Sequence, residues 1–263
     1  MNSNATCNII NNQRMDKIRV ENIIEPKDSR VNFTNQMLKV ENLSVFIEGD
    51  LILDNVSFEV EKGKTFAIIG PNGAGKTTLF KTLLGLLPYQ KGMVSWQKNV
   101  KIGYVPQRIE IEKTIPLTVE EFLKLRTRNV SQKEIEDILE SIQLNKIVLK
   151  KGLGEVSIGQ RQRLFIAWTI LEHPDVILFD EPTADVDVYG QESIYKMLSH
   201  LQQEFNLTVI LISHDLSVVY QYANSVMCLN HKNICSGKPA DIINTETMKK
   251  LFGEEKGFYE HKH

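Results

Sequence analysis

The fold is decided by one glycine-rich stretch that joins a buried strand to a helix: Gly70-Pro71-Asn72-Gly73-Ala74-Gly75-Lys76-Thr77. The apolar run before it, at 65–69, is typical of a buried parallel strand, and a helix is expected after it, at 77–87. This order predicts a P-loop, in which backbone N–H groups and the helix N-terminus face phosphates. We expect Lys76 to reach the β- and γ-phosphates of a nucleotide and Thr77 to ligate Mg²⁺, with Thr78 beside them.

A second strand ends in two carboxylates. The apolar run at 176–179 is followed directly by Asp180 and Glu181. Such a strand lies inside the sheet, so both carboxylates emerge at its carboxyl end, where ligands bind in open α/β sheets. We expect Asp180 to hold Mg²⁺ and Glu181 to act as general base toward an attacking water. The structural alternatives are a chance glycine turn and an acidic pair that only caps the next helix. The surrounding strand and helix pattern argues against both.

The rest of the pattern predicts an α/β fold. A further apolar strand lies at 208–212, and a helix is expected before it, at 190–205. Alternating segments at 38–45 and 55–60 predict antiparallel strands. The middle of the chain is mostly helical and contains two capping boxes, Thr118 with Glu121 and Ser131 with Glu134.

Composition narrows the class of protein. The 263 residues include 31 Lys+Arg and 33 Asp+Glu, a formal net charge of −2, so no basic footprint for nucleic acid is expected. No apolar run approaches the roughly 20 residues that span a bilayer. The start of the chain is Asn-rich, without the apolar segment of a secretory signal. Three cysteines are too few for a disulfide framework and suit a reducing compartment. Residues 1–36 are polar and weakly periodic, and we expect them to form a disordered extension.

Four further segments, together with the P-loop and the acidic strand, resemble the ATP-binding subunits of ABC transporters. They are a Q-loop-like, a signature-like, a D-loop-like and an H-loop-like segment: Tyr104-Val105-Pro106-Gln107, Val156-Ser157-Ile158-Gly159-Gln160, Ala184-Asp185-Val186-Asp187 and Ser213-His214-Asp215. A P-loop with an acidic strand end also occurs in kinases, GTPases and RecA-like motors, but the full ordered set is specific to the ABC family. The resemblance covers residues 37–263. It implies an ABC ATPase domain with a RecA-like P-loop NTPase core, an antiparallel β-lobe and an α-helical lobe at about 108–170.

The resemblance also implies a role for each segment. Two copies of such a subunit sandwich two ATP molecules head to tail. Gln107 would contact Mg²⁺ and the attacking water, and His214 would contact the γ-phosphate and support Glu181. Asp187 would carry state information across the dimer interface. The signature segment of one copy would contact the γ-phosphate held by the P-loop of the other, through Ser157, Gly159 and Gln160.

Two positions depart from the family pattern. Ile158 replaces the first glycine of the signature pair, and its branched side chain cannot adopt glycine-only conformations and adds bulk near the phosphates. Ser157 and Gly159 remain, so we expect the phosphate contact to be kept in a less tight sandwich. The tyrosine that stacks on adenine in the family falls on Ile47, and the adjacent Phe46 is a candidate to replace it. A packed edge-strand residue is an equally good interpretation of Phe46.

Several stretches resemble the zinc/manganese-type metal importers of bacteria. They lie after the Q-loop, after the acidic strand, around the H-loop and at the C-terminus: 116–123, 185–192, 213–219 with 228–230, and 259–263. This resemblance implies import of a divalent metal, with zinc favoured. It also implies two membrane permease subunits, an extracytoplasmic metal-binding protein, and a location at the cytoplasmic face of the inner membrane. Manganese import, iron-chelate import and a non-transport ABC ATPase are the alternatives. A kinase, or a regulator that binds ATP without hydrolysing it, fits the residues less well.

Two cysteines invite a direct metal interpretation. Segments 226–230 and 234–236 predict a hairpin with a tight turn over His231 and Lys232, which places Cys228 opposite Cys235 with Cβ atoms about 4.5–5.5 Å apart. Together with His231 or the terminal histidines, they are candidate Zn²⁺ ligands. We favour the plainer interpretation, in which two small buried residues flank a solvated turn.

Overall fold

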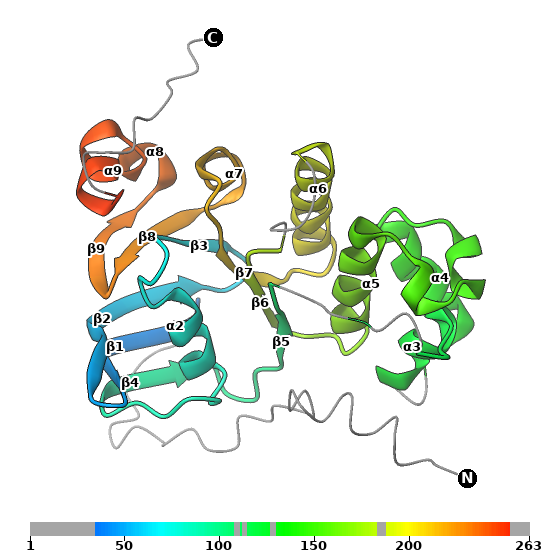
Figure 1. The fold of residues 1–263 in the computed structure, drawn as a ribbon, viewed down its shortest axis with the longest axis horizontal. Helices are drawn as coiled ribbons and strands as arrows, with labels where there is room; N and C mark the ends of the chain where they lie inside the picture. Colours follow the sequence, from blue (N-terminus) through cyan, green and yellow to red (C-terminus); the bar gives the residue numbers. More distant parts are fainter. Residues whose placement is uncertain (1–34, 108–110, 112–114, 127–129, 183–187, 253–263) are drawn as a thin grey trace.

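The computed structural model describes residues 35–107, 111, 115–126, 130–182 and 188–252, and these ranges hold two β-sheets and their covering helices (Figure 1). The part of residues 1–36 before residue 35 lies outside the described ranges, as do the terminal histidines. The strands, in chain order, are β1 Gln36–Ile47, β2 Asp50–Glu61, β3 Thr65–Ile69, β4 Lys91–Trp96, β5 Ile102–Val105, β6 Val176–Asp180, β7 Thr208–Ile212, β8 Ser225–Asn230 and β9 Lys232–Gly237.

The larger sheet has the strand order β5-β6-β7-β3-β8-β9. Neighbours from β5 to β8 run parallel, and β9 pairs antiparallel with β8. Every residue of β3, β6 and β7 is buried, which explains why these strands are continuous apolar runs and not alternating ones. The carboxyl ends of the parallel strands therefore meet at one edge, and the predicted α/β fold is confirmed.

The smaller sheet, with strand order β2-β1-β4, is antiparallel. It confirms the expected antiparallel lobe, although β1 and β2 are longer than predicted. Its inner face contributes Leu38, Val40 and Val56 to a core shared with the larger sheet. Helix α2 lies between the two sheets and contributes Leu79 and Phe80 to the same core (Figure 1).

The helices are α2 Lys76–Leu83, α3 Val119–Arg126, α4 Gln132–Ser141, α5 Ile158–Ile170, α6 Val188–Glu204, α7 Leu216–Tyr222, α8 Pro239–Ile242 and α9 Thr245–Phe252, with 3-10 helices at Lys146–Lys150 and Leu153–Glu155. Helices α3 to α6 share one core with the sheet face opposite α2, and α7 to α9 cover β8 and β9. Helix α2 ends at Leu83 and not at 87, because Gly85 adopts a left-handed φ of 68° that ends the helix.

Two capping boxes begin helices of the α3–α5 region, as the sequence predicted. The Thr118 and Ser131 amides donate to the carboxylates of Glu121 and Glu134, both at 2.8 Å. The Glu121 and Glu134 amides donate back to the two hydroxyls at 3.2 Å. Within the described ranges, each helix is too short or too polar to traverse a bilayer.

Candidate functional site

The P-loop connects β3 to α2 through backbone conformations that require glycine. Gly73 and Gly75 have φ values of 80° and 92°, which side chains other than glycine rarely adopt. A Cβ at Gly70 would lie 2.0 Å from the Leu229 carbonyl oxygen on β8. The loop is also attached to the β8–β9 turn, because the His231 amide donates to the Ala74 carbonyl at 3.0 Å. The sequence alone did not indicate this attachment.

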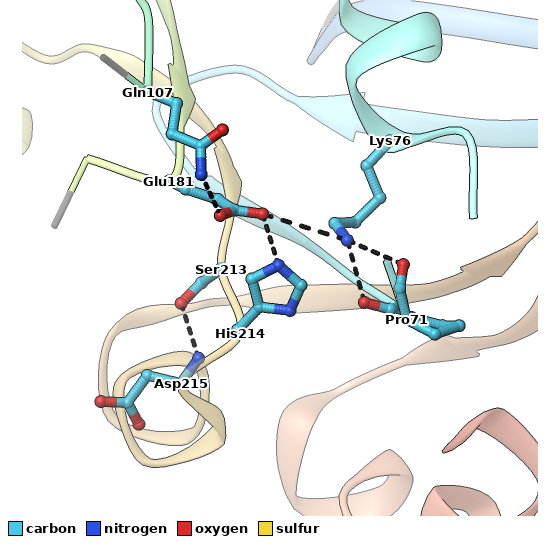
Figure 2. A network of polar contacts seen from close by, with 8 residues as sticks. Pro71, Lys76, Gln107, Glu181, Ser213, His214 and Asp215 are labelled. Atoms are coloured by element: carbon cyan, nitrogen blue, oxygen red, sulfur yellow. Dashed lines mark hydrogen bonds and ion pairs between the residues drawn. The ribbon is translucent and has the colours of Figure 1, made fainter. Parts of the chain in front are cut away.

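Lys76 begins α2 and is 6% exposed. Its Nζ donates to the carbonyl oxygens of Gly70 at 2.9 Å and Pro71 at 3.0 Å, so the ammonium group folds back onto its own loop (Figure 2). Burial lowers the pKa of Lys76, and the charges of Glu181 and Asp180 oppose this shift. The ammonium group is therefore held by neutral carbonyls in a place where anionic oxygens would bind it more strongly.

Asp180 is the last residue of β6 and is only 3% exposed. The Thr77 and Tyr104 hydroxyls lie near its carboxylate, and its Oδ1 atom is buried without a hydrogen-bond partner among the described residues. Burial and the Glu181 charge raise the pKa of Asp180 to about 6, while the neighbouring Thr77 hydroxyl, the Lys76 charge and the Tyr104 hydroxyl act to lower it. A buried carboxylate with one free oxygen beside a hydroxyl is a donor set that a hard cation prefers.

The side chains of three predicted site residues lie around the Glu181 carboxylate (Figure 2). Its carboxylate accepts a hydrogen bond from Gln107 Nε2 at 2.8 Å. His214 Nε2 lies 2.5 Å and Lys76 Nζ 4.0 Å from Glu181 Oε1. Glu181 has a left-handed φ of 49°, a conformation uncommon for a residue with a side chain. Segments far apart in the sequence thus converge on one carboxylate, as expected for a general base.

The His214 segment is fixed by its position between β7 and α7. The Ser213 amide donates to the Ile68 carbonyl at 3.3 Å, and its hydroxyl accepts from the Asp215 amide at 3.1 Å. Asp215 caps α7 by accepting from the Ser217 and Val218 amides. These bonds direct His214, which is half exposed, toward Glu181 at the carboxyl edge of the sheet.

The signature-like segment lies apart from the P-loop of the same chain. Helix α5 and helix α2 occupy opposite faces of the larger sheet (Figure 1). Ser157 and Gln160 form a capping box: the Ser157 amide donates to Gln160 Oε1 at 3.1 Å, and the Gln160 amide donates to the Ser157 hydroxyl at 3.2 Å. No hydrogen bond or ion pair in the described ranges joins Ser157, Gly159 or Gln160 to residues 70–78.

Ile158 has a backbone conformation that does not require glycine. It is the first residue of α5, is absent from the positive-φ residues of the described chain, and is 56% exposed. No glycine-only conformation is needed at this position, so isoleucine fits the backbone here. The apolar side chain faces solvent beside Ser157, and a Cβ at the neighbouring Gly159 would meet nothing within 4 Å.

Phe46 and Asp187 are the two remaining residues predicted to contact ATP or the dimer interface. Phe46 is 36% exposed near the end of β1, where its amide donates to Gln90 Oε1 at 2.8 Å. Its side chain is therefore partly packed and partly accessible, which is compatible with both interpretations. Asp187 lies outside the described residues.

The β8–β9 hairpin has the predicted pairing of its two cysteines and an additional bond between them. Cys228 and Cys235 are opposite each other as predicted, but a disulfide joins them. Neither interpretation of the sequence included this bond. The turn is centred on His231 alone, because Lys232 already belongs to β9. In the described part of the chain, no group of three or more His, Cys, Asp and Glu residues could hold a metal ion.

The sheet order, the P-loop and the carboxylates at the end of β6 define a P-loop nucleotide-binding protein. The family model described as ABC transporter matches residues 53–184. The zinc import ATP-binding protein ZnuC of Pasteurella multocida is 36% identical over 231 residues, covering 86% of this chain and 87% of that protein. ZnuC of Vibrio parahaemolyticus is 38% identical, with coverage of 86% and 87%.

Solved structures agree with these relatives. The cbiO1 protein of Clostridium perfringens, part of the ABC transporter complex cbiONQ, has a TM-score of 0.72 and 25% identity, covering 82% of this chain and 94% of that chain. MJ1267, an ATP-binding cassette of an ABC transporter in its ADP conformation, has a TM-score of 0.73 at 24% identity, covering 84% and 100%, and shows the shared fold. This chain belongs to the ABC transporter family, as one of its ATP-binding ATPase subunits.

Proposed function

We propose that this chain hydrolyses ATP to drive the import of zinc through partner membrane permeases. The observation that supports the ATPase chemistry best is the convergence of Gln107, His214 and Lys76 on the Glu181 carboxylate. Zinc is supported by the zinc import ATP-binding proteins that are 36–38% identical to this chain over 86% of its length.

The P-loop would hold the triphosphate. Residues 72–75 carry backbone N–H groups at the start of α2, and Lys76 is already buried beside them. An incoming γ-phosphate offers anionic oxygens in place of the Gly70 and Pro71 carbonyls, so we expect Lys76 Nζ to leave these carbonyls for the phosphate. This movement would also separate Lys76 from Glu181. We assign Thr78, directly after Thr77, and the exposed Phe46 ring to the same nucleotide, with Phe46 stacking on adenine.

Magnesium fits the residues around Asp180. The unpartnered, buried Oδ1 of Asp180 and the adjacent Thr77 hydroxyl form an oxygen donor set, and Gln107 lies at the same edge of the sheet. These three residues would hold Mg²⁺. When bound, the ion would neutralise charge on the β- and γ-phosphates.

Hydrolysis requires a water in line with the γ-phosphorus. Glu181 would orient this water and accept its proton as the oxygen attacks, while the bond between the γ-phosphorus and the leaving ADP oxygen breaks. Gln107 would position the water, and His214 would bind the γ-phosphate and hold Glu181. The left-handed φ of Glu181 places its side chain toward both partners.

The second half of the site would come from a second copy of the chain. Ser157, Gly159 and Gln160 begin a helix, so their hydroxyl and N–H groups can bind phosphate oxygens. They lie away from the P-loop of their own chain. In a head-to-tail homodimer they would complete the partner's site, and we assign Asp187 to the same interface.

The remaining assignments concern the assembly. An importer of this family requires permease subunits, and we place this chain at the cytoplasmic face of the inner membrane, bound to two of them. An extracytoplasmic metal-binding protein would deliver the cargo. Residues 37–263 would form the ABC unit, with its helical lobe at about 108–170.

The cargo can be tested in cells. We expect deletion of the gene to lower cellular zinc, measured by mass spectrometry, and to impair growth in a chelator. The wild-type gene should restore both, whereas Lys76→Ala should restore neither. Unchanged zinc with lowered manganese or iron would replace zinc by that metal, and unchanged metals in a strain without a second importer would contradict metal import.

A further inference from the structure

Arg163 lies in the second turn of α5, one helical turn after Gly159, and its side chain is hydrogen-bonded to two other helical segments. Its Nη1 atom donates to the Ile142 carbonyl at 2.7 Å and to Gln143 Oε1 at 3.2 Å, both at the end of α4. Its Nη2 atom donates to the Ser193 hydroxyl of α6 at 2.7 Å. One guanidinium group therefore connects α5 to α4 and to α6.

The end of α4 offers acceptors because the helix stops there. Ile142 follows Ser141, the last residue of α4, and Gln143 has a left-handed φ of 58°. The carbonyls at the end of a helix have no partner within it, so the bond from Arg163 satisfies the Ile142 carbonyl. Burial lowers the pKa of Arg163, but a guanidinium keeps its charge in proteins. Its planar fork holds the donors in a fixed geometry, which fixes the three acceptors relative to one another.

The bond between Arg163 and Ser193 lies beside an apolar core that α5 and α6 share. The residues that follow these two, Leu164 and Ile194, are both buried in that core. Apolar packing is non-directional, whereas a hydrogen bond requires a defined distance and angle. The bond therefore fixes how α5 is turned relative to α6. It also lies in the second turn of α6, near the end of that helix that follows β6.

We propose that Arg163 is a positioning residue for the shared ATP site, which holds α5 in the orientation that presents Ser157 and Gly159 to the partner's nucleotide. This inference rests on the proposed head-to-tail homodimer. The bonds between Ser157 and Gln160 cap the helix without connecting it to α6. The bond from Arg163 to Ser193 makes that connection one turn further along, so its loss would let the start of α5 turn away from the partner.

The test removes the Ser193 hydroxyl and keeps Arg163, because loss of the arginine would also leave the Ile142 carbonyl without this donor. Ser193→Ala is compared with Ser141→Ala. The Ser141 hydroxyl also joins α4 to α6, but at the far end of α6, where it lies 3.4 Å from Glu204 Oε1. Ser193→Thr keeps a hydroxyl and is the rescue variant.

All variants are made in the full chain with Glu181→Gln, which should slow hydrolysis so that a dimer formed with Mg-ATP persists. Sedimentation velocity in Mg-ATP measures the dissociation constant of the dimer. Binding of a fluorescent ATP analogue is measured at chain concentrations at which only the monomer is present. Circular dichroism verifies that each variant is folded.

We expect Ser193→Ala to raise the dissociation constant of the dimer about tenfold, because each dimer would lose two hydrogen bonds to a charged donor. Its monomer should bind ATP as tightly as the parent, since the P-loop lies on the other face of the sheet. Ser141→Ala and Ser193→Thr should match the parent in both measurements.

Three results would overturn the inference: an unchanged dissociation constant in Ser193→Ala, an equal rise in Ser141→Ala or Ser193→Thr, or a tenfold loss of ATP affinity in the Ser193→Ala monomer. If the Glu181→Gln parent stays monomeric in Mg-ATP, the proposed homodimer itself fails, and the role of Arg163 fails with it.

Discussion

The P-loop edge and the start of α5 are built in opposite ways. At the P-loop edge, Lys76 and Asp180 are 6% and 3% exposed, and polar groups are already bonded to one another. At the start of α5, Ile158 is 56% exposed, and Ser157 and Gln160 bond only within their own helix turn in the described chain. The first region is preorganised within one chain. The second presents N–H and hydroxyl groups outward, which explains why a site divided between two copies suits this fold.

The largest effect should come from the buried region. We expect Glu181→Gln to lower ATP turnover by about 10²–10⁴-fold, because an amide cannot accept the proton of the attacking water. The amide can still bond to Gln107 and His214, so ATP binding should persist. Turnover by a phosphate-release assay and binding by filter retention measure the two effects. Glu140→Gln, an exposed change on α4, is the control. Near-normal turnover in Glu181→Gln would remove Glu181 as the base.

The next effect is on stability. Folding raises the pKa of Asp180 from 3.8 to about 6, so the folded state binds more protons than the unfolded state between these values. The Asp180 contribution to stability is therefore lost as pH rises from about 4 to 6. We expect Asp180→Asn, without metal, to raise the free energy of unfolding at pH 7 by about 1–3 kcal/mol. Urea unfolding at pH 7 and pH 4 measures this gain, which should nearly vanish at pH 4. An equal gain at both values would contradict the shifted pKa.

A smaller effect separates capping from phosphate binding at the start of α5. Ser157 and Ser131 form matching capping boxes on α5 and α4. We expect Ser157→Ala and Ser131→Ala each to lower the free energy of unfolding by about 1 kcal/mol. Only Ser157→Ala should also lower turnover, by about tenfold, since only this hydroxyl would reach the partner's nucleotide. Equal turnover in the two variants would leave Ser157 with a structural role alone.

The sequence predicted the elements whose pattern is set by burial. Strands β3 and β7 match the expected bounds because each residue in them is apolar or small enough to be buried. The family resemblance implied that Gln107 and His214 lie with Lys76 and Glu181, and the structure explains this grouping because parallel strands place their carboxyl ends at one edge. The family resemblance supplied the roles.

Other features depend on three-dimensional contacts that the sequence does not display. The β5–β6 register places Tyr104 opposite Leu178, on the sheet face that also carries Asp180. Strand alternation would have placed both residues on one face, but the pairing of the strands was unknown. The return of Lys76 to the Gly70 and Pro71 carbonyls likewise depends on the loop geometry. Ile158 is helical because Ser157 caps the start of α5. From the sequence we assigned Ser157 to phosphate binding and did not predict this cap.

The central claim is that each ATP site uses the P-loop of one copy and the α5 start of the other. The most direct test mixes two inactive variants, Lys76→Ala and Gly159→Arg. A side chain at Gly159 meets nothing within 4 Å in its own chain, so the fold should tolerate it. In a mixed dimer, one site would combine the intact P-loop of one variant with the intact α5 start of the other. An equimolar mixture should regain up to about a quarter of wild-type turnover, because half of the dimers would be mixed and each would hold one intact site. A mixture no more active than the two variants measured alone would contradict the shared site.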